Sequence, residues 1–260
     1  MHHRTALITA GARGLGVSVA HYLASRGIRV GINYRNSYNQ ARTLKEELKS
    51  QYGIESLLVK GDVTIPETGE NMVNEMIQQW GRLDILIHNA GPYIKERKKL
   101  TEYSVEEWQE IINGNLSSAF YLFRAAIPQM RKNGWGRIIT IGYEKADTAP
   151  GWMYHSAFAA AKTGLVSLTK TVAMEEAEHC ITANMICPGD ITDEFKHKKI
   201  TDVRTIKDGT CPVGRPGTGE DIARAISFFC NEESDFITGS VLEVTGGKDV
   251  LNKHKWLREE

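Results

Sequence analysis

Three side chains that could hold or transfer a proton lie within the segment MYHSAFAAAK (153–162). Lys162 carries an ammonium group, and Tyr154 and His155 lie eight and seven residues before it. At ~100° per residue, a helix would place both on roughly the same face as Lys162, together with the apolar ring of Phe158. An imidazole titrates near neutral pH, and a neighbouring cation makes a phenol a better acid by lowering its pKa. The segment therefore predicts a proton-transfer site.

A glycine-rich turn, TAGARGLG, follows the first strand-like run and precedes a helix. Glycines in such a turn let the backbone bend tightly and come close to a pyrophosphate held at the helix N-terminus. The turn predicts a dinucleotide site that includes Thr9, Gly11, Arg13, Gly14, Leu15 and Gly16.

The end of the second strand, roughly 20 residues past the glycines, indicates which dinucleotide binds. An NAD enzyme normally places a carboxylate there to bind the ribose hydroxyls, whereas arginine accommodates a 2′-phosphate. The segment reads Tyr34-Arg35-Asn36, and neither Asp nor Glu occurs between Gly31 and Leu44. Together with Arg13, residues Arg35 and Asn36 predict NADP(H) as the cofactor.

The elements that must position these groups alternate along the chain as short β-branched runs and helix-period segments. Strands are expected at 5–9, 29–34, 56–60, 83–88, 137–142, 181–187 and 240–244. Helices are expected at 14–26, 38–51, 66–80, 104–132, 154–178 and 218–231. The pattern predicts an α/β fold, a doubly wound parallel sheet (Rossmann fold) of about seven strands with helices on both faces. Because Pro150 and Gly151 precede Tyr154, its helix can also begin just after it, and Tyr154 would then reach the site from a loop.

Length and composition fit one soluble domain over residues 1–260. Thirty-two basic and 32 acidic side chains cancel, so the overall charge favours neither nucleic acid nor an anionic membrane. No apolar run approaches the ~20 residues needed to cross a bilayer, and the N-terminus lacks a signal-peptide core. Four cysteines without C-x-x-C spacing predict no metal site and fit a reducing cytoplasm, with burial as their expected role.

The chain resembles the short-chain dehydrogenase/reductases over almost its full length. The motifs that carry the resemblance are TAGARGLG, GDV (61–63), HNAG (88–91), NGNLSSAF (113–120), GRIITIG (136–142), AAAKTGLVSLTK (159–170), ANMICPGDIT (183–192) and the segment 214–247. Within the family, the motif sequences are most similar to those of the 3-oxoacyl-acyl-carrier-protein reductases. One departure is Ala10, which stands at the first glycine of the family turn, and Gly11 beside it is expected to take over the turn.

The resemblance implies further cofactor contacts. These are Asp62 and Val63 beside the adenine, Asn89, Ala90 and Gly91 on the ribose side, and Pro188, Gly189 and Ile191 at the nicotinamide carboxamide. Asn115 matches the asparagine that carries a water in the family's proton relay. Lys162 matches the lysine that bonds the nicotinamide ribose and lowers the pKa of a neighbouring tyrosine.

The family's serine and tyrosine positions hold Tyr143 and Phe158 here. In the family, the tyrosine donates a proton to the carbonyl oxygen as hydride arrives, and losing a positioned acid costs ~10²–10⁴-fold in rate. Tyr154 is predicted to replace the donor, His155 is the alternative, and Tyr143 either lines the pocket or takes part in catalysis. Enoyl-acyl-carrier-protein reductases are similar here: they place one tyrosine at the serine position and another seven residues before the lysine.

Three functions follow. The first is an NADP-dependent reductase acting on the carbonyl of a 3-oxoacyl thioester or similar small substrate, with Tyr154 as the acid. The second is an enoyl-thioester reductase that uses Tyr143 and Tyr154. The third is a catalytically impaired NADP-binding sensor or partner protein, because Phe158 carries no proton.

Three surface features concern substrates and partners. The long segment 190–217 lacks clear periodicity and predicts a substrate lid. The basic run KERKK (95–99), with Arg131 and Lys132, could meet an acidic acyl carrier protein, although a solvated charge run is the alternative. Tyr93, just after HNAG, is expected to form a pocket wall. By resemblance, the protein is expected to be a homotetramer.

Overall fold

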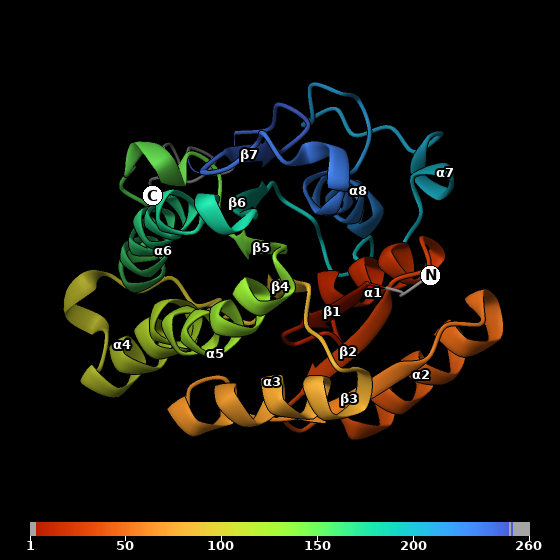
Figure 1. The fold of residues 1–260 in the computed structure, drawn as a ribbon. Helices are drawn as coiled ribbons and strands as arrows, with labels where there is room; N and C mark the ends of the chain where they lie inside the picture. Colours follow the sequence, from red (N-terminus) through yellow and green to blue (C-terminus); the bar gives the residue numbers. More distant parts are fainter. Residues whose placement is uncertain (1–3, 250, 252–260) are drawn as a thin grey trace, which may run out of the picture.

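The computed structural model describes residues 4–249 and 251. In this part of the chain a parallel sheet of seven strands runs in the order β3-β2-β1-β4-β5-β6-β7, with β7 at the top and β3 at the bottom of Figure 1. The strands are β1 (Thr5–Ile8), β2 (Arg29–Tyr34), β3 (Ser56–Lys60), β4 (Ile85–His88), β5 (Gly136–Ile141), β6 (Ile181–Pro188) and β7 (Val241–Val244). The predicted Rossmann fold is confirmed.

Helices cover both faces of the sheet, because each central strand buries its side chains on both sides. One face packs against α3 (Pro66–Trp80), α5 (Ser118–Asn133) and α6 (Ser156–Glu175), seen on the left and below in Figure 1. The other packs against α1 (Leu15–Ser25), α2 (Tyr38–Tyr52) and α8 (Gly219–Cys230).

The helix expected at 104–132 is interrupted near its middle. It consists of α4 (Val105–Ile112), a π-helical turn η2 (Asn113–Ser117) and α5. Such turns leave backbone groups without their usual helical partners and are frequent at functional sites. The interruption places Asn115 where the helix is irregular.

The helix expected at 154–178 begins later, at Ser156. His155 is its N-cap, and Tyr154 lies in the preceding turn with a left-handed φ of 70°. The loop placement of Tyr154 is therefore the one that the structure adopts.

The glycine turn corrects one expectation. Gly11 does not take over the turn, because Ala10 itself adopts the left-handed φ of 48°. This conformation costs an L-residue ~1–2 kcal/mol. Gly11 is needed for close packing instead, since a Cβ there would lie 2.9 Å from the Ile8 carbonyl oxygen. The Ala10 N–H donates to Asn33 Oδ1 at 3.0 Å, which helps to hold the strained turn.

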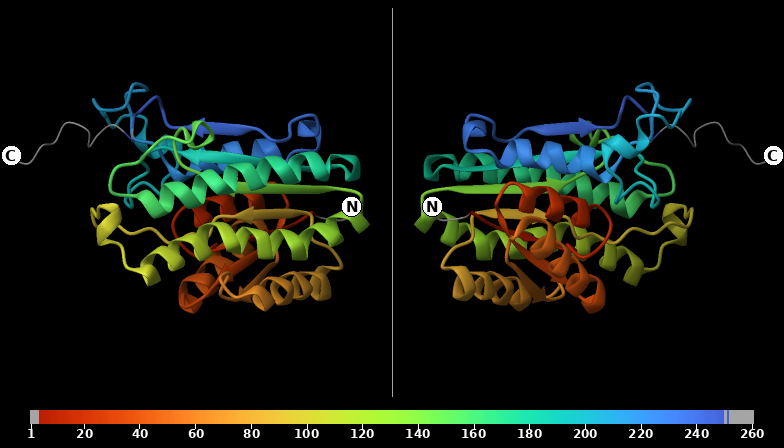
Figure 2. Two further views of the ribbon diagram at one scale, coloured as in Figure 1. Left: turned by 90° about the vertical axis from the view of Figure 1, so that its left-hand side faces the viewer. Right: turned by 90° about the vertical axis from the view of Figure 1, so that its right-hand side faces the viewer.

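The loops that follow the carboxyl ends of the strands gather at one end of the molecule, on the left of the left-hand view in Figure 2. The segment 190–217 lies there and contains a short helix α7 (Ile200–Val203). In open α/β sheets ligands bind at this end.

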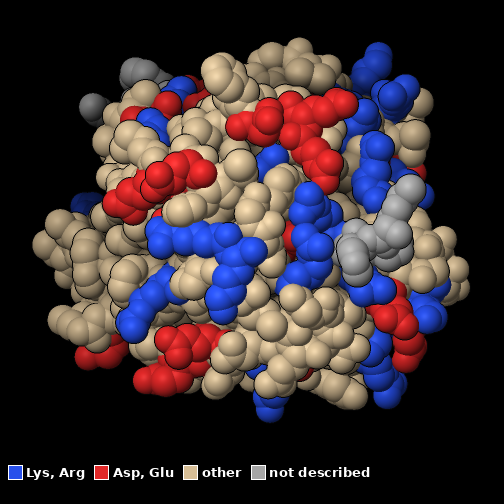
Figure 3. All heavy atoms as spheres, in the orientation of Figure 1, with Lys and Arg blue, Asp and Glu red and all other residues tan. Residues whose placement is uncertain are grey.

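Figure 3 shows acidic and basic side chains in several separate groups of each sign, distributed over the same face. This agrees with the equal totals of 32 acidic and 32 basic residues. In the described part of the chain, no helix has the length and apolar character needed to span a membrane. Cys187, Cys211 and Cys230 are buried as expected, but the expectation is wrong for Cys180, which is exposed after the end of α6.

Candidate active site

The ends of β1 and β4 are joined by Thr9 and Asn89. Thr9 Oγ1 accepts hydrogen bonds from the backbone N–H groups of Asn89 and Ala90, both at 2.9 Å. The Asn89 side-chain amide donates to the Thr9 carbonyl oxygen at 3.0 Å. These two residues therefore act as a scaffold that fixes the glycine turn against β4.

The start of α1 fits a bound pyrophosphate. Its N-cap, Gly14, has no side chain to occupy this position, so the positive end of the helix dipole faces the turn, where an anion is favoured. A Cβ on Gly16 would lie 2.7 Å from the Ala10 carbonyl oxygen, so only glycine lets the turn and helix approach this closely. The residues present thus match what a dinucleotide requires.

A cavity of about 380 Å³ continues from this turn along the ends of β2 and β3. The predicted cofactor residues that line it are Arg13, Arg35, Asn36, Asp62, Val63, Ala90 and Gly91. Arg35 forms an ion pair with Asp62 at 3.3 Å. Burial alone would raise the pKa of Asp62, but hydrogen bonds from Thr64 and Arg35 hold it below its ordinary value. Asp62 is thus an ionised, engaged carboxylate.

Asn33 belongs to this region, although none of the sequence motifs contains it. Its side chain is buried, accepts from Ala10 N–H, and donates to the carbonyl oxygens of Val59 and Gly61, each at 3.1 Å. It therefore ties the ends of β1, β2 and β3 together below the cavity. An amide inside the apolar run RVGINY is the signal that could have identified it.

Lys162 is buried at the other end of the cleft, with 3% of its surface exposed. Its Nζ donates to the Ile141 carbonyl oxygen at 2.7 Å, at the carboxyl end of β5. Burial lowers the pKa of Lys162 to about 8. Burial, together with the charge of Lys162, lowers the pKa of His88 to about 3, so His88 is neutral at physiological pH. The ammonium is therefore the cation at this end of β4 and β5.

Asn115 and Lys162 both lie beside Gly91. The Asn115 amide nitrogen donates to the carbonyl oxygens of Pro92 at 2.9 Å and Ile111 at 3.0 Å. Its Oδ1 is buried and receives no hydrogen bond from the described residues. A Cβ on Gly91 would collide with this oxygen and lie 3.4 Å from Lys162 Nζ. A buried acceptor beside a cation is the kind of place that an ordered water satisfies.

An aromatic cluster stands beside the lysine, formed by Tyr93, Tyr143, Trp152, His155 and Phe158. The Phe158 ring centroid lies 5.5 Å from Lys162 Nζ. Tyr143 stacks on Trp152 with the centroids 5.2 Å apart, and its hydroxyl donates to the Pro150 carbonyl oxygen at 3.2 Å. Burial raises the pKa of Tyr143. The Tyr143 ring thus lines the pocket, and its hydroxyl hydrogen is already used in the hydrogen bond to Pro150.

Comparison with known proteins shows which family the chain belongs to. Residues 9–249 match the family model described as Enoyl-(Acyl carrier protein) reductase. The chain is 51% identical over 254 residues to YtkK of Bacillus subtilis, named as an oxidoreductase, covering 97% of this chain and 99% of that protein. The chain belongs to the short-chain dehydrogenase/reductase family.

Two further members of this family are similar over most of their length. A 3-oxoacyl-(acyl-carrier-protein) reductase, FabG of Staphylococcus epidermidis, is 32% identical over 246 residues, covering 94% of this chain and 98% of its own. A solved structure from Bacillus thuringiensis, described as a 3-oxoacyl-reductase, superposes with a TM-score of 0.89 at 50% identity. It covers 96% of this chain and 99% of its own.

Tyr154, the family tyrosine's predicted replacement, lies outside the aromatic cluster. Its ring centroid is 5.8 Å from the Arg97 guanidinium carbon, and its carbonyl oxygen accepts from the Tyr103 hydroxyl at 3.0 Å. The structure thus brings together Lys162, Asn115 and Tyr143 but turns Tyr154 toward the 93–103 loop. A catalytic role for Tyr154 stays a prediction.

The segment that holds the nicotinamide in the family follows β6. Gly189 N–H donates to the Val244 carbonyl oxygen and Ile191 N–H to the Gly189 carbonyl oxygen, each at 3.0 Å. A Cβ on Gly189 would lie 2.7 Å from Thr245 Cα, so β7 packs directly against this turn. Pro188, Gly189 and Ile191 therefore form a fixed wall at the carboxyl edge.

The candidate lid, residues 190–217, is hydrogen-bonded both to α1 and to the loop that follows β4. The Ser18 hydroxyl of α1 donates to the Lys196 carbonyl oxygen at 2.7 Å, and Lys95 Nζ donates to Asp193 Oδ2 at 3.5 Å. Within the KERKK run, Lys98 pairs with Glu107. Much of this basic run is thus engaged inside the chain.

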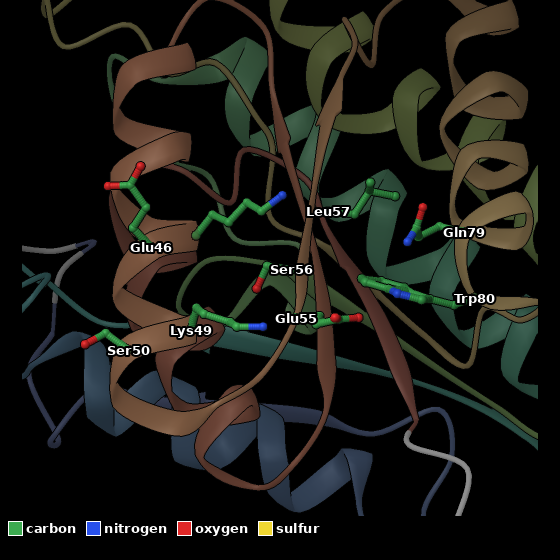
Figure 4. Close-up of a pocket in the computed structure, with 9 residues that line it drawn as sticks. Glu46, Lys49, Ser50, Glu55, Ser56, Leu57, Gln79 and Trp80 are labelled. Atoms are coloured by element: carbon green, nitrogen blue, oxygen red, sulfur yellow. The ribbon is translucent and has the colours of Figure 1, made fainter.

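A second cavity, of about 620 Å³, lies at the edge strand β3 between α2 and α3 (Figure 4). Ser56 Oγ and Trp80 Nε1 have no hydrogen-bond partner among the described residues. They belong to opposite faces of the strand, because Ser56 faces α2 whereas Leu57 faces α3 and Trp80. The polar groups do not converge, so this cavity adds no reactive centre.

Proposed function

We propose that the protein is a cytoplasmic NADPH-dependent reductase that acts on the carbonyl of a 3-oxoacyl thioester or a similar small substrate. One observation carries the proposal. The buried ammonium of Lys162 and the Oδ1 of Asn115, which has no partner among the described residues, both lie beside Gly91, between a nucleotide cavity and an aromatic cluster. This arrangement offers a cation and a water position where hydride transfer to a carbonyl develops negative charge.

The preference for NADPH rests on the charges of the nucleotide cavity. Arg13 and Arg35 both line it, and each is exposed enough to reach a 2′-phosphate. Asp62 is already bonded to Thr64 and Arg35, and no carboxylate follows β2 to bind the ribose hydroxyls. Guanidinium groups match phosphate geometry through paired hydrogen bonds.

Bound NADPH supplies a hydride to the carbonyl carbon. Lys162 would hold the nicotinamide ribose and favour negative charge on the substrate oxygen through its own positive charge. Asn115 would hold a water that links Lys162 to solvent and returns protons. Trp152, Phe158 and Tyr143 would exclude bulk water from the reacting carbonyl, which strengthens these electrostatic effects.

Phe158 supports a second candidate, an NADPH-binding protein without turnover. The phenyl ring stands beside Lys162 at 5.5 Å and has no proton to give. The enoyl-reductase alternative receives less support, because the Tyr143 hydroxyl is bonded to Pro150 and the Tyr154 ring lies against Arg97.

Assembly and a carrier-bound substrate are further parts of the proposal. A homotetramer is supported by exposed aromatic side chains on two faces, Trp108 and Phe120 on α4 and α5, and Phe228 and Phe236 on and after α8. An acyl carrier protein would meet the exposed Lys99 rather than Lys98, which is already paired, or Lys132, which lies in the last turn of α5 at the opposite end of the sheet.

The test combines binding and turnover. NADPH and NADH are titrated by fluorescence, and NADPH oxidation is then followed with acetoacetyl- and crotonyl-thioesters. We expect tighter binding of NADPH and oxidation with the acetoacetyl substrate. Preference for crotonyl would favour the enoyl reductase, and binding without oxidation of either would favour the second candidate.

A further inference from the structure

We infer that Tyr93, held by His155, is the proton donor that replaces the hydroxyl missing at Phe158. The inference rests on the proposed reductase function and assigns its acid to a residue outside the family's serine, tyrosine and lysine positions. Tyr93 would be the catalytic residue, and His155 would be a positioning residue that acts through it.

The Tyr93 ring packs directly on the ring that lacks the hydroxyl. The centroids of Tyr93 and Phe158 are 5.1 Å apart with the planes at 86°. The Phe158 ring is in turn 5.5 Å from Lys162 Nζ. Two tyrosines of the described chain, Tyr93 and Tyr143, contact the Phe158 ring. Of these two, Tyr143 has its hydroxyl bonded to a backbone carbonyl oxygen, whereas the Tyr93 hydroxyl is bonded to His155.

His155 fixes the Tyr93 hydroxyl. Its Nε2 lies 3.1 Å from the Tyr93 oxygen, with the ring centroids 5.0 Å apart. His155 is 4% exposed and caps α6, where its carbonyl oxygen accepts from Ala159 N–H at 2.9 Å. Trp152 packs against its ring at 4.8 Å. A buried side chain at a helix start is a rigid support for a reacting group.

Tyr93 also has the protonation state and the access that a donor needs. Burial, together with the charges of Tyr103 and Asp190, raises the pKa of Tyr93, so it keeps its proton at neutral pH. It is 43% exposed, so it lies between the aromatic cluster and solvent. Its proton can therefore be replaced from water after each turnover.

The tautomer of His155 decides where the Tyr93 proton points. When Nε2 carries a hydrogen, His155 donates to the Tyr93 oxygen, and the phenol hydrogen is left for the substrate. The same hydrogen bond stabilises the phenolate as it forms. This is the arrangement that the inference requires.

The step balances in atoms and electrons. Hydride from NADPH forms a C–H bond at the carbonyl carbon, and the π electrons of the C=O bond move to oxygen. That oxygen takes the Tyr93 proton, so the phenol O–H bond breaks as the alcohol O–H bond forms. The phenolate then takes a proton from water, leaving the hydroxyalkyl product and NADP⁺.

The experiment compares single hydroxyl deletions in the full chain with NADPH and acetoacetyl thioester. Tyr93→Phe is expected to lower kcat by ~10²–10⁴-fold, since it removes a positioned acid. The NADPH Kd should stay within about twofold, because Tyr93 does not line the nucleotide cavity. Tyr121→Phe, on α5 and outside the aromatic cluster, is the matched control.

Two further variants separate chemistry from packing. In the Tyr93→Phe background, Phe158→Tyr returns a hydroxyl beside Lys162 and should restore at least tenfold of the lost kcat. His155→Gln retains a hydrogen-bonding group and should keep more of the kcat than His155→Leu, with the KM for the thioester little changed. Thermal melts check that each variant is folded.

Two results overturn the inference. One is a Tyr93→Phe variant with wild-type kcat, and the other is a Tyr154→Phe variant whose kcat falls further than that of Tyr93→Phe. Wild-type protein that binds NADPH but reduces neither thioester overturns the proposed function itself. The two failures are therefore distinguishable.

Discussion

The nucleotide end of the cleft departs from the family at one position and the reaction end at two, with different consequences. At the nucleotide end, Ala10 replaces a glycine and the backbone still turns with a φ of 48°. At the reaction end, Phe158 replaces a tyrosine, so an apolar ring without a hydroxyl lies beside the Lys162 ammonium. The first site works through backbone N–H groups, which most residues supply. The second works through one oxygen atom, which few side chains supply.

The difference teaches where a substitution can be absorbed. A strained turn costs ~1–2 kcal/mol, and neighbouring hydrogen bonds such as that from Ala10 to Asn33 hold it in place. A missing acid cannot be offset by packing, so another group has to carry its proton. The Tyr93–His155 pair lies where such a group is needed.

The largest expected effect is at the reaction end. Lys162→Met should lower kcat/KM by ~10³-fold or more, because it removes the cation that stabilises developing negative charge. Steady-state NADPH oxidation measures the loss. Lys170→Met, eight residues along the same helix and exposed, is the control and should stay near wild type. Equal loss in both would place the effect in helix stability.

The next effect concerns the nucleotide end. Arg35→Ala should reduce the preference for NADPH over NADH by about 10–100-fold, since a charge-assisted hydrogen bond contributes about 1.5–3 kcal/mol. Fluorescence titration with both nucleotides measures it. Arg42→Ala, exposed on α2 and paired with Glu46, is the matched control. An unchanged preference would show that Arg35 does not read the 2′-phosphate.

His88, at the end of β4 between the two regions, makes stability depend on pH. Its pKa falls from the ordinary 6.5 to about 3 in the folded chain. Between these values the unfolded chain binds a proton that the folded chain does not, so stability is lost as pH falls through this window. Urea unfolding should show a slope of up to about 1.4 kcal/mol per pH unit.

The matching variant is His88→Asn, which should lose this part of the slope. His179→Asn, at the surface after α6, should keep it. If the free energy of unfolding changes with pH equally in wild type and in His88→Asn between pH 4 and 6.5, His88 is protonated in the folded chain. The description of the Lys162 environment would then be wrong.

The smallest expected effect is on stability and concerns the strained turn at Ala10, at the nucleotide end. Ala10→Gly should stabilise the protein by about 1 kcal/mol, because glycine adopts a positive φ without strain. Chemical denaturation measures it. Ala160→Gly, exposed within α6, should instead cost about 0.5–1 kcal/mol. A destabilised Ala10→Gly would mean that the turn is not strained.

Much of the fold could be predicted because it depends on periodicity. The β-branched runs became seven parallel strands in the described chain, most of them within a residue or two of their expected ends. Arg13, Arg35 and Asp62 line one cavity because they follow the adjacent strands β1, β2 and β3, and their role in binding a cofactor stays a prediction. Glycine spacing also indicated the cradle at Gly16, where a Cβ would not fit.

The reaction end could not be predicted to the same depth. The turn that carries Tyr154 depends on a left-handed φ of 70° at a non-glycine residue, which no pattern indicates. Tyr93 and His155 are 62 residues apart and meet only through tertiary packing. The π-helical turn at Asn115 likewise has no simple sequence signal.

The most direct test of the central claim is a single-turnover measurement on the wild-type protein. NADPH is bound first, acetoacetyl thioester is added, and the decay of nucleotide fluorescence is followed. The account predicts oxidation of one NADPH per site, faster with acetoacetyl than with crotonyl thioester. NADPH that stays bound and reduced with both substrates would contradict it.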